Sequence, residues 1–224
     1  MALKILAIPF FALALLPMSA SASDWPELFS DAVSGPAGPV TLYSYEASSR
    51  DVTGDEVMRY RFTPGATPEF EFISLSKKFE RNKDDLLIEL EGEGDDIWCD
   101  DVAHKVAGDV RQVAEDEDTV TFAFQPTDPL ADEDEAALLE KSVARVTVNK
   151  ASRQISDVVY ELTEPFKPAV VAKINAFKLE GSCVAAPSGR PYFQQLTVSM
   201  DLSTLGEREW DVTVQTVENL QEVN

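Results

Sequence analysis

Apolar and polar residues alternate along much of this chain, and this period of two constrains the fold more than any other feature. Such alternation is typical of β-strands, whose successive side chains point to opposite faces of a sheet. Each run leaves one face polar, which favours antiparallel strands, because the strands of parallel sheets are usually buried on both faces. The clearest runs are Met58–Phe62, Val120–Phe124, Ala144–Val148, Val158–Leu162, Leu196–Leu202 and Trp210–Val214.

Short, turn-rich segments connect the strands of the C-terminal half, namely Asn149–Arg153, Pro187–Pro191 and Ser203–Gly206. Connections of this kind join neighbouring antiparallel strands. We therefore predict a four-strand meander from about Val143 to Val217.

One of these strands changes its apolar phase. Ala172, Ile174 and Ala176 share one face, whereas the next apolar residues are Phe177 and Leu179. An extra residue near Ala176 would restore the alternation, and a β-bulge supplies such a residue. The sequence therefore predicts a bulge or sharp bend near Ala176, and a sheet that curves as a barrel or half-barrel does.

The helical signals are few and short. Asp24 is a suitable N-cap for a helix that continues to Val33, with Pro26 in its first turn. The acidic run Asp132–Glu135 suits the start of a second helix, from about Glu133 to Lys141, because the helix dipole favours negative charge there.

The stretch from Leu75 to Ala107 fits two alternatives, a helix around Lys83–Glu91 or a strand around Leu86–Leu90. The chain as a whole is predicted to be mainly β with minor helices. We expect a curved antiparallel sheet, in the form of a half-barrel, with short helices packed against its concave face. Residues 23–224 would form one domain, since all-β architectures of about 200 residues are commonly single.

Residues 1–22 have the layout of a secretory signal peptide. Lys4 supplies the positive charge, Ile5–Leu16 the apolar segment, and Ala20–Ala22 the small residues of a cleavage site. A membrane anchor is the alternative, but this apolar segment is shorter than the roughly 20 residues that span a bilayer. We expect a periplasmic or secreted protein, without a lipid anchor because no cysteine lies at the cleavage site, and without an integral membrane span.

The chain has two cysteines, Cys99 and Cys183. Exported proteins meet an oxidising compartment, in which a pair of cysteines often forms a disulfide. The alternative is two buried thiols, which behave as small apolar side chains. We predict the Cys99–Cys183 disulfide.

The chain is strongly acidic, with 19 Lys and Arg against 40 Asp and Glu, a net charge of −21. This charge disfavours nucleic acid and anionic lipid headgroups as partners of the surface as a whole. A basic partner would suit it, and no particular protein partner is indicated.

The residues that catalysis usually needs are scarce. His104 is the only histidine, and a disulfide would remove the thiol of nearby Cys99 from any thiol–imidazole pair. We interpret His104 as a structural residue. Neither zinc-ligand spacing nor a phosphate-binding glycine loop is present, so we predict no enzyme activity, no metal and no cofactor.

Two acidic patches offer carboxylates without a specific pattern. Glu115–Asp118 is predicted to be a hairpin tip between Val110–Ala114 and Thr119–Gln125, and Asp132–Glu135 a helix start. Calcium is the functional alternative, but neither patch has the spacing of a calcium loop.

Aromatic residues fall on the apolar faces of the predicted strands, where most are expected to be core residues. A curved sheet with an apolar concave face can also leave a cavity for an acyl chain or another apolar ligand. The candidate ligand face consists of Phe122, Phe124, Tyr160, Tyr192 and Trp210.

The layout of about Thr119–Val217 resembles the LolA-like periplasmic lipoprotein-carrier superfamily. A helix precedes the strand Val143–Val148, a turn leads to Gln154–Leu162, and Glu164–Pro168 precedes the long bent strand Val170–Val184. The resemblance implies an unclosed antiparallel sheet that wraps around helices and receives acyl chains on its concave face, or serves as a sensor domain in envelope-stress regulators. The acidic loops depart from this pattern, and no individual binding residue can be transferred.

Three functional hypotheses follow. The first is a non-enzymatic periplasmic protein that binds a lipid-like or apolar ligand within its curved sheet. The second is an envelope interaction or assembly module that acts through its surface. The third is a carboxylate-based enzyme, which requires a cleft that contains carboxylates with raised pKa values.

Overall fold

The computed structural model describes residues 25–35, 41–93, 97–129 and 131–223. The predicted signal peptide, residues 1–22, lies outside the described residues, as does Asp24, the predicted cap of the first helix. The first helix, α1 (Glu27–Val33), begins one residue after Pro26, which occupies the N-cap position without a side-chain cap. Pro26 therefore precedes the first helical turn that it was predicted to join.

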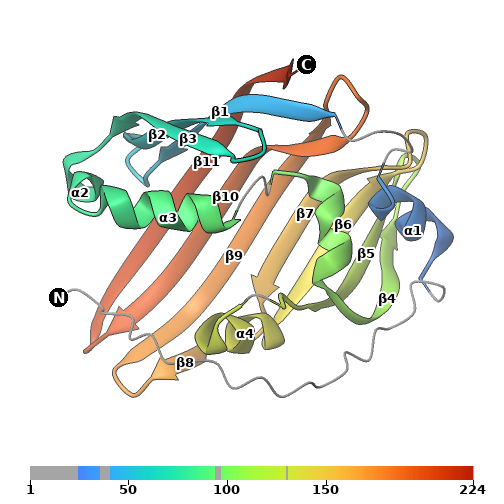
Figure 1. The fold of residues 1–224 in the computed structure, drawn as a ribbon. Helices are drawn as coiled ribbons and strands as arrows, with labels where there is room; N and C mark the ends of the chain where they lie inside the picture. Colours follow the sequence, from blue (N-terminus) through green and yellow to red (C-terminus); the bar gives the residue numbers. More distant parts are fainter. Residues whose placement is uncertain (1–24, 36–40, 94–96, 130, 224) are drawn as a thin grey trace, which may run out of the picture.

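Eleven strands form one curved, unclosed antiparallel sheet (Figure 1), which confirms the predicted fold class. The strands pair in the order β3-β2-β1-β11-β10-β9-β7-β6-β5-β4, and β8 pairs with β9 beside this path. The strands are β1 (Leu42–Arg50), β2 (Glu56–Thr63), β3 (Glu69–Leu75), β4 (Val106–Glu115), β5 (Thr119–Pro126), β6 (Ser142–Asn149), β7 (Gln154–Leu162), β8 (Phe166–Ala169), β9 (Ala172–Ala185), β10 (Pro191–Thr204) and β11 (Glu207–Val223).

The C-terminal meander has more strands than predicted. Five long strands, β6, β7, β9, β10 and β11, lie where four were expected, and the short β8 adds a further hairpin. The predicted connection Ser203–Gly206 contains the two-residue turn Leu205–Gly206, and β10 and β11 pair from Gln195–Thr216 to Thr204–Glu207.

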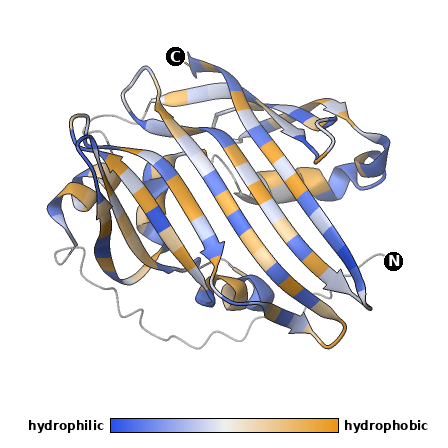
Figure 2. Ribbon diagram, turned by 180° about the vertical axis from the view of Figure 1, so that it is seen from behind, coloured by the Kyte–Doolittle hydropathy of each residue, from blue (hydrophilic) through white to orange (hydrophobic). Residues whose placement is uncertain are grey.

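The segment that the sequence left open, Leu75–Ala107, connects the two edges of the sheet. It leaves β3 at one edge and enters β4 at the other, through α2 (Lys77–Glu80), α3 (Lys83–Glu93) and the 3₁₀ helix η2 (Cys99–Lys105). The helical alternative for Lys83–Glu91 is therefore correct. Figure 1 shows α3 and η2 in front of the strands, whereas Figure 2 shows the outer face of the central strands uncovered by helices.

The second predicted helix is confirmed as α4 (Glu133–Glu140). The carboxylate of Asp132 accepts a hydrogen bond from the backbone N–H of Glu135 at 2.9 Å, so the acidic run caps the helix that it was predicted to begin. Within the described residues, no helix has the length and apolarity that a membrane crossing requires.

The predicted bulge lies one residue from its expected place. Ala176 pairs with Asp201 and Ile174 pairs with Leu202, which leaves Asn175 as the extra residue of β9. The Asn175 side chain donates hydrogen bonds to Asp201 and Ser203 of the neighbouring strand, at 3.2 Å and 2.8 Å. A second bulge leaves Gln194 unpaired in β10, between the pairs Phe193–Cys183 and Gln195–Ser182.

Two clusters of buried apolar residues pack the helices and their connecting segments against the sheet. In the first, Phe29 of α1 is fully buried, with ring centroids 5.6 Å from Phe122 and 5.8 Å from Phe124. The second consists of aromatic residues from β1, from β2 and from the position just before η2, namely Tyr43, Tyr45, Tyr60, Phe62 and Trp98. The alternation of β5 and β6 is thus explained, since their apolar faces are covered by α1.

The predicted disulfide between Cys99 and Cys183 is present, with a Cα–Cα distance of 6.4 Å. It joins η2 to β9 across the concave face. Arg190 reinforces this attachment, since its Nε donates to both Asp100 carboxylate oxygens at 2.9 Å and its Nη2 donates to Asp101 at 2.8 Å. The same guanidinium stacks 4.3 Å from the centroid of the Trp98 ring.

Removal of the disulfide by the paired substitution Cys99→Ala and Cys183→Ala is expected to lower the free energy of unfolding. The residues are 84 apart in sequence, and the chain-entropy model gives about 4–5 kcal/mol for a loop of this length. Denaturant titration by circular dichroism measures the loss. Wild-type protein under reducing conditions is the control and should match the variant, and equal midpoints for oxidised wild type and variant would contradict this prediction.

Candidate functional site

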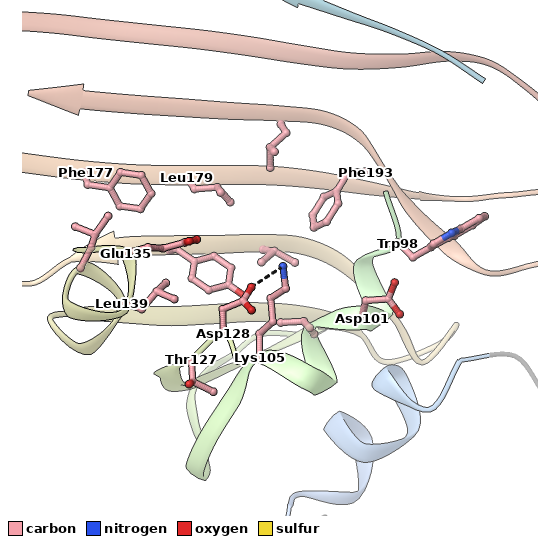
Figure 3. A pocket seen from close by; sticks show the side chains of 15 residues that line it. Trp98, Asp101, Lys105, Thr127, Asp128, Glu135, Leu139, Phe177, Leu179 and Phe193 are labelled. Atoms are coloured by element: carbon pink, nitrogen blue, oxygen red, sulfur yellow. Dashed lines mark ion pairs between the residues drawn. The ribbon is translucent and has the colours of Figure 1, made fainter. Parts of the chain in front are cut away.

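A cavity of about 210 Å³ lies on the concave face, between the strands β7, β9 and β10 and the cover formed by η2 and α4 (Figure 3). Its floor is apolar. The register of the three strands brings apolar side chains together here. Tyr160 of β7 pairs with Leu179 of β9, and Gly181 of β9 pairs with Val158 of β7 on one side and with Leu196 of β10 on the other. The floor consists of Val158, Tyr160, Phe177, Leu179, Phe193 and Leu196.

Gly181 makes room for one wall of this cavity. A Cβ atom placed on Gly181 would lie 2.4 Å from Cε1 of Phe193, far inside van der Waals contact. The Phe193 ring therefore occupies the space that a side chain at position 181 would fill. The bulge at Gln194 lets Phe193 and Leu196 lie on the same face although they are three residues apart.

The cover of the cavity comes from two helices. η2 contributes Val102 and Lys105, the residue before it contributes Trp98, and α4 contributes Leu138 and Leu139. α4 has no buried residue. A second hollow of about 190 Å³ lies beside it and shares Leu139 as a lining residue. α4 therefore lies between two hollows, and its last turn is held by Gln125, which donates to the carbonyl of Leu139 at 2.7 Å, and by Ser142, which donates to that of Leu138 at 2.8 Å.

The rim of the cavity is polar and mainly acidic. Lys105 Nζ lies 3.5 Å from Asp128 Oδ2, and Figure 3 shows this ion pair beside Glu135. Partial burial raises the pKa of Glu135, the carboxylates of Asp128 and Asp132 raise it further, and Lys105 opposes these effects. The rim therefore presents one lysine among several carboxylates.

The five residues of the predicted ligand face lie in different parts of the structure. Tyr160 lines the cavity. Phe122 and Phe124 are 1% and 2% exposed and pack against α1. Tyr192 packs in the second apolar cluster. Trp210 is 54% exposed. It pairs with Asp201 of β10, which is an odd number of residues from the cavity-lining Leu196. Because successive side chains of a strand point to opposite faces, Trp210 lies on the outer face.

Sequence reasoning missed Phe177, Leu179, Phe193 and Leu196 as lining residues. Their alternation identified an apolar face, but two bulges change which residues share it. The phase change after Ala176 was the available signal for Phe177 and Leu179. No comparable local signal marks Phe193, whose place depends on the missing side chain of Gly181 across the strand pair.

His104 and the acidic run Glu115–Asp118 are not among the residues that line the cavity. His104 is exposed on η2, and Cys99 is in the disulfide, so no thiol lies beside the imidazole. At the β4–β5 tip, Asp116 accepts hydrogen bonds from the N–H groups of Asp118 and Thr119, and Glu115 pairs with Lys150 at 2.7 Å. In the part of the chain that the structure describes, no group of three or more His, Cys, Asp or Glu side chains is placed to hold a metal ion.

We compared the chain with models of protein families, with curated proteins and with solved structures. None of the three comparisons gave a match. Membership of the LolA-like superfamily therefore stays a prediction from the layout of the sequence, and the function has to be argued from the cavity and the surface.

Substitution of Gly181 tests the construction of the cavity. Gly181→Ala should lower the free energy of unfolding by about 1–3 kcal/mol, because the added methyl forces Phe193 to move. Combining it with Phe193→Leu should cost less than the sum of the two single losses, as a double-mutant cycle by denaturant titration would show. Gly65→Ala is the control, since its Cβ meets nothing closer than 3.4 Å; additive losses would contradict the predicted contact.

The raised pKa of Glu135 predicts a pH-dependent effect on stability. The folded protein binds this proton more tightly than the unfolded chain does, so the group stabilises the fold at low pH and loses that contribution as the pH rises through its raised pKa. Glu135→Gln should therefore gain stability relative to wild type as the pH rises from about 4 to 7.

Thermal unfolding at several pH values measures this difference. Asp134→Asn is the control, because it removes the same charge from the same helix turn but does not line the cavity. A difference between Glu135→Gln and wild type that does not change with pH would contradict the assignment.

Proposed function

We propose that this chain is an extracytoplasmic, non-enzymatic protein that binds an apolar or lipid-like ligand in the cavity on its concave face. The observation that carries the proposal is the apolar floor formed by three neighbouring strands beneath the cover of η2 and α4. The Cys99–Cys183 disulfide is compatible with an oxidising compartment outside the cytoplasm.

The size of the cavity limits the ligand. Its 210 Å³ is below the roughly 300–1,000 Å³ of typical small-molecule sites. One short apolar chain fits the cavity as it stands. A longer chain requires displacement of α4, which has no buried residue and is held at its last turn by hydrogen bonds from Gln125 and Ser142. The second hollow beside α4 would then join the first, because Thr127, Asp128 and Leu139 line both.

The rim favours some headgroups over others. Among the described lining residues, Asp101, Asp128 and Glu135 are the carboxylates and Lys105 is the cation; Asp101 pairs with Arg190 and Asp128 with Lys105, so Glu135 is the excess negative charge of the rim. Anionic headgroups would meet this acidic rim unfavourably. The proposed ligand therefore has an apolar tail and a neutral or cationic head.

An interaction module is the second candidate, and the open edges of the sheet favour it. Ile73 on the edge strand β3 and Val113 on the edge strand β4 are 44% and 54% exposed. Exposed edges can pair with a strand of another chain. Crosslinking that recovers one stoichiometric partner, together with a cavity that takes up no apolar probe, would favour this candidate.

The third hypothesis, a carboxylate-based enzyme, is favoured by one observation, the raised pKa of Glu135 at the cavity rim. The neighbouring Asp128 carboxylate pairs with Lys105. Acid–base chemistry does not require an apolar floor, whereas binding of an apolar ligand does. We therefore prefer the ligand-binding proposal.

Blocking the floor tests the proposal. Leu196→Trp should lower the affinity for the apolar dye N-phenyl-1-naphthylamine at least tenfold, because the larger side chain fills the cavity. Thr197→Trp is the matched control, since the next residue of β10 pairs with Glu180 and points to the outer face. Fluorescence titration measures dye binding, and native mass spectrometry of protein exported to a bacterial periplasm detects co-purified lipid.

The expected result is dye binding by wild type and Thr197→Trp, with loss in Leu196→Trp. Absence of both dye uptake and co-purified lipid in wild type would refute the proposal. Equal binding by both tryptophan variants would place the dye elsewhere and would also count against it.

A further inference from the structure

Two hairpin turns lie side by side at one end of the sheet, at the lower left of Figure 1. One joins β8 to β9 through Val170 and Val171, and the other joins β10 to β11 through Leu205 and Gly206. The N–H of Leu205 donates to the carbonyl of Val171 at 3.0 Å, so the two turns are in direct contact. We call them the paired tips.

The side chains at the paired tips are unusually apolar and exposed. Val170 is 101% exposed, Leu205 75% and Val171 54%. Figure 2 shows the β8–β9 turn as a hydrophobic segment at the end of the sheet. Single exposed apolar residues are ordinary on protein surfaces, whereas a group of neighbours marks an interaction site.

Leu205 also adopts a backbone conformation that leucine disfavours. Its φ is 53° and that of Gly206 is 90°, the positive values that a two-residue type I′ hairpin requires. Asn, Asp and Gly are the residues that such turns prefer at the first position, because they tolerate positive φ. Folding alone would therefore favour a polar residue at position 205.

The charge of the paired tips differs from that of the rest of the chain. Segments 166–173 and 201–208 carry three cations, Lys167, Lys173 and Arg208, and two carboxylates, Asp201 and Glu207, a net charge of +1 in a chain of net charge −21. Arg208 donates to Asp201 at 2.8 Å, whereas Lys167 is exposed and Lys173 is partly exposed.

We propose that the paired tips insert into the interface of an anionic lipid bilayer. Val170, Val171 and Leu205 would enter the boundary with the acyl chains, and Lys167 and Lys173 would lie at the level of the phosphates. The acidic remainder of the surface is repelled by such a bilayer, so the molecule approaches it with this end first. Docking does not depend on whether the cavity holds a ligand.

A bilayer fits these features better than a protein partner does. The apolar side chains project from the two turns themselves, and basic residues flank them along the strands, which matches the layered polarity of a membrane interface. A protein partner would instead need a groove shaped to receive the tips, and the test below separates the two.

The test is co-sedimentation of the mature chain with vesicles of phosphatidylethanolamine and phosphatidylglycerol, compared with vesicles of phosphatidylcholine alone. Wild type is expected to bind the anionic vesicles, and added salt to weaken the binding. Leu205→Asn should weaken it at least fivefold and should also raise the Tm by about 2–4 °C, because Asn tolerates the turn better. Val52→Asn is the control, since Val52 is 59% exposed on the β1–β2 turn away from this pair.

A second pair of variants separates the apolar from the electrostatic contribution. Lys167→Gln with Lys173→Gln should abolish the preference for anionic vesicles, and Leu205→Trp should show a blue-shifted tryptophan emission only when vesicles are present. Vesicle binding by Leu205→Asn equal to that of wild type would overturn the proposal. Absence of wild-type binding to the anionic vesicles would also overturn it, and capture of a stoichiometric protein through the tips would then identify a protein as the partner.

Discussion

The crossing of the chain from β3 to β4 is the constraint on which the helical side of this protein depends. The two strands lie at opposite edges of an open sheet, so the connection between them has to pass over one face. It passes over the apolar concave face, where its own apolar residues, such as Trp98 and Val102, can be buried. The disulfide and Arg190 then attach η2 to the middle of the sheet, and the cavity lies between this attachment and α4.

Irregularities in two central strands give the concave face its shape. The extra residues Asn175 and Gln194 bend β9 and β10 and change which side chains share a face. Gly181 leaves a gap in the floor that the Phe193 ring enters. A perfectly regular sheet would place a continuous row of side chains there, and the floor would be flat and filled.

Strand β9 links the two proposed functions. Its middle supplies Phe177 and Leu179 to the cavity floor, and the turn before it supplies Val170 and Val171 to the paired tips. A lipid-like ligand and the interior of a bilayer share apolar chemistry. The two proposals nonetheless rest on different residues, and each stands or fails by itself.

The sequence by itself determined the antiparallel β architecture, the bulge near Ala176, the capped helix after Asp132 and the Cys99–Cys183 pair. These features depend on local periodicity, on neighbouring residues, or on the presence of just two cysteines. Only the tertiary structure decided the path of Leu75–Ala107, the lining role of Phe193 and the outward position of Trp210. Each of these depends on which strands become neighbours and in what register, and a shift of one residue moves a side chain to the opposite face.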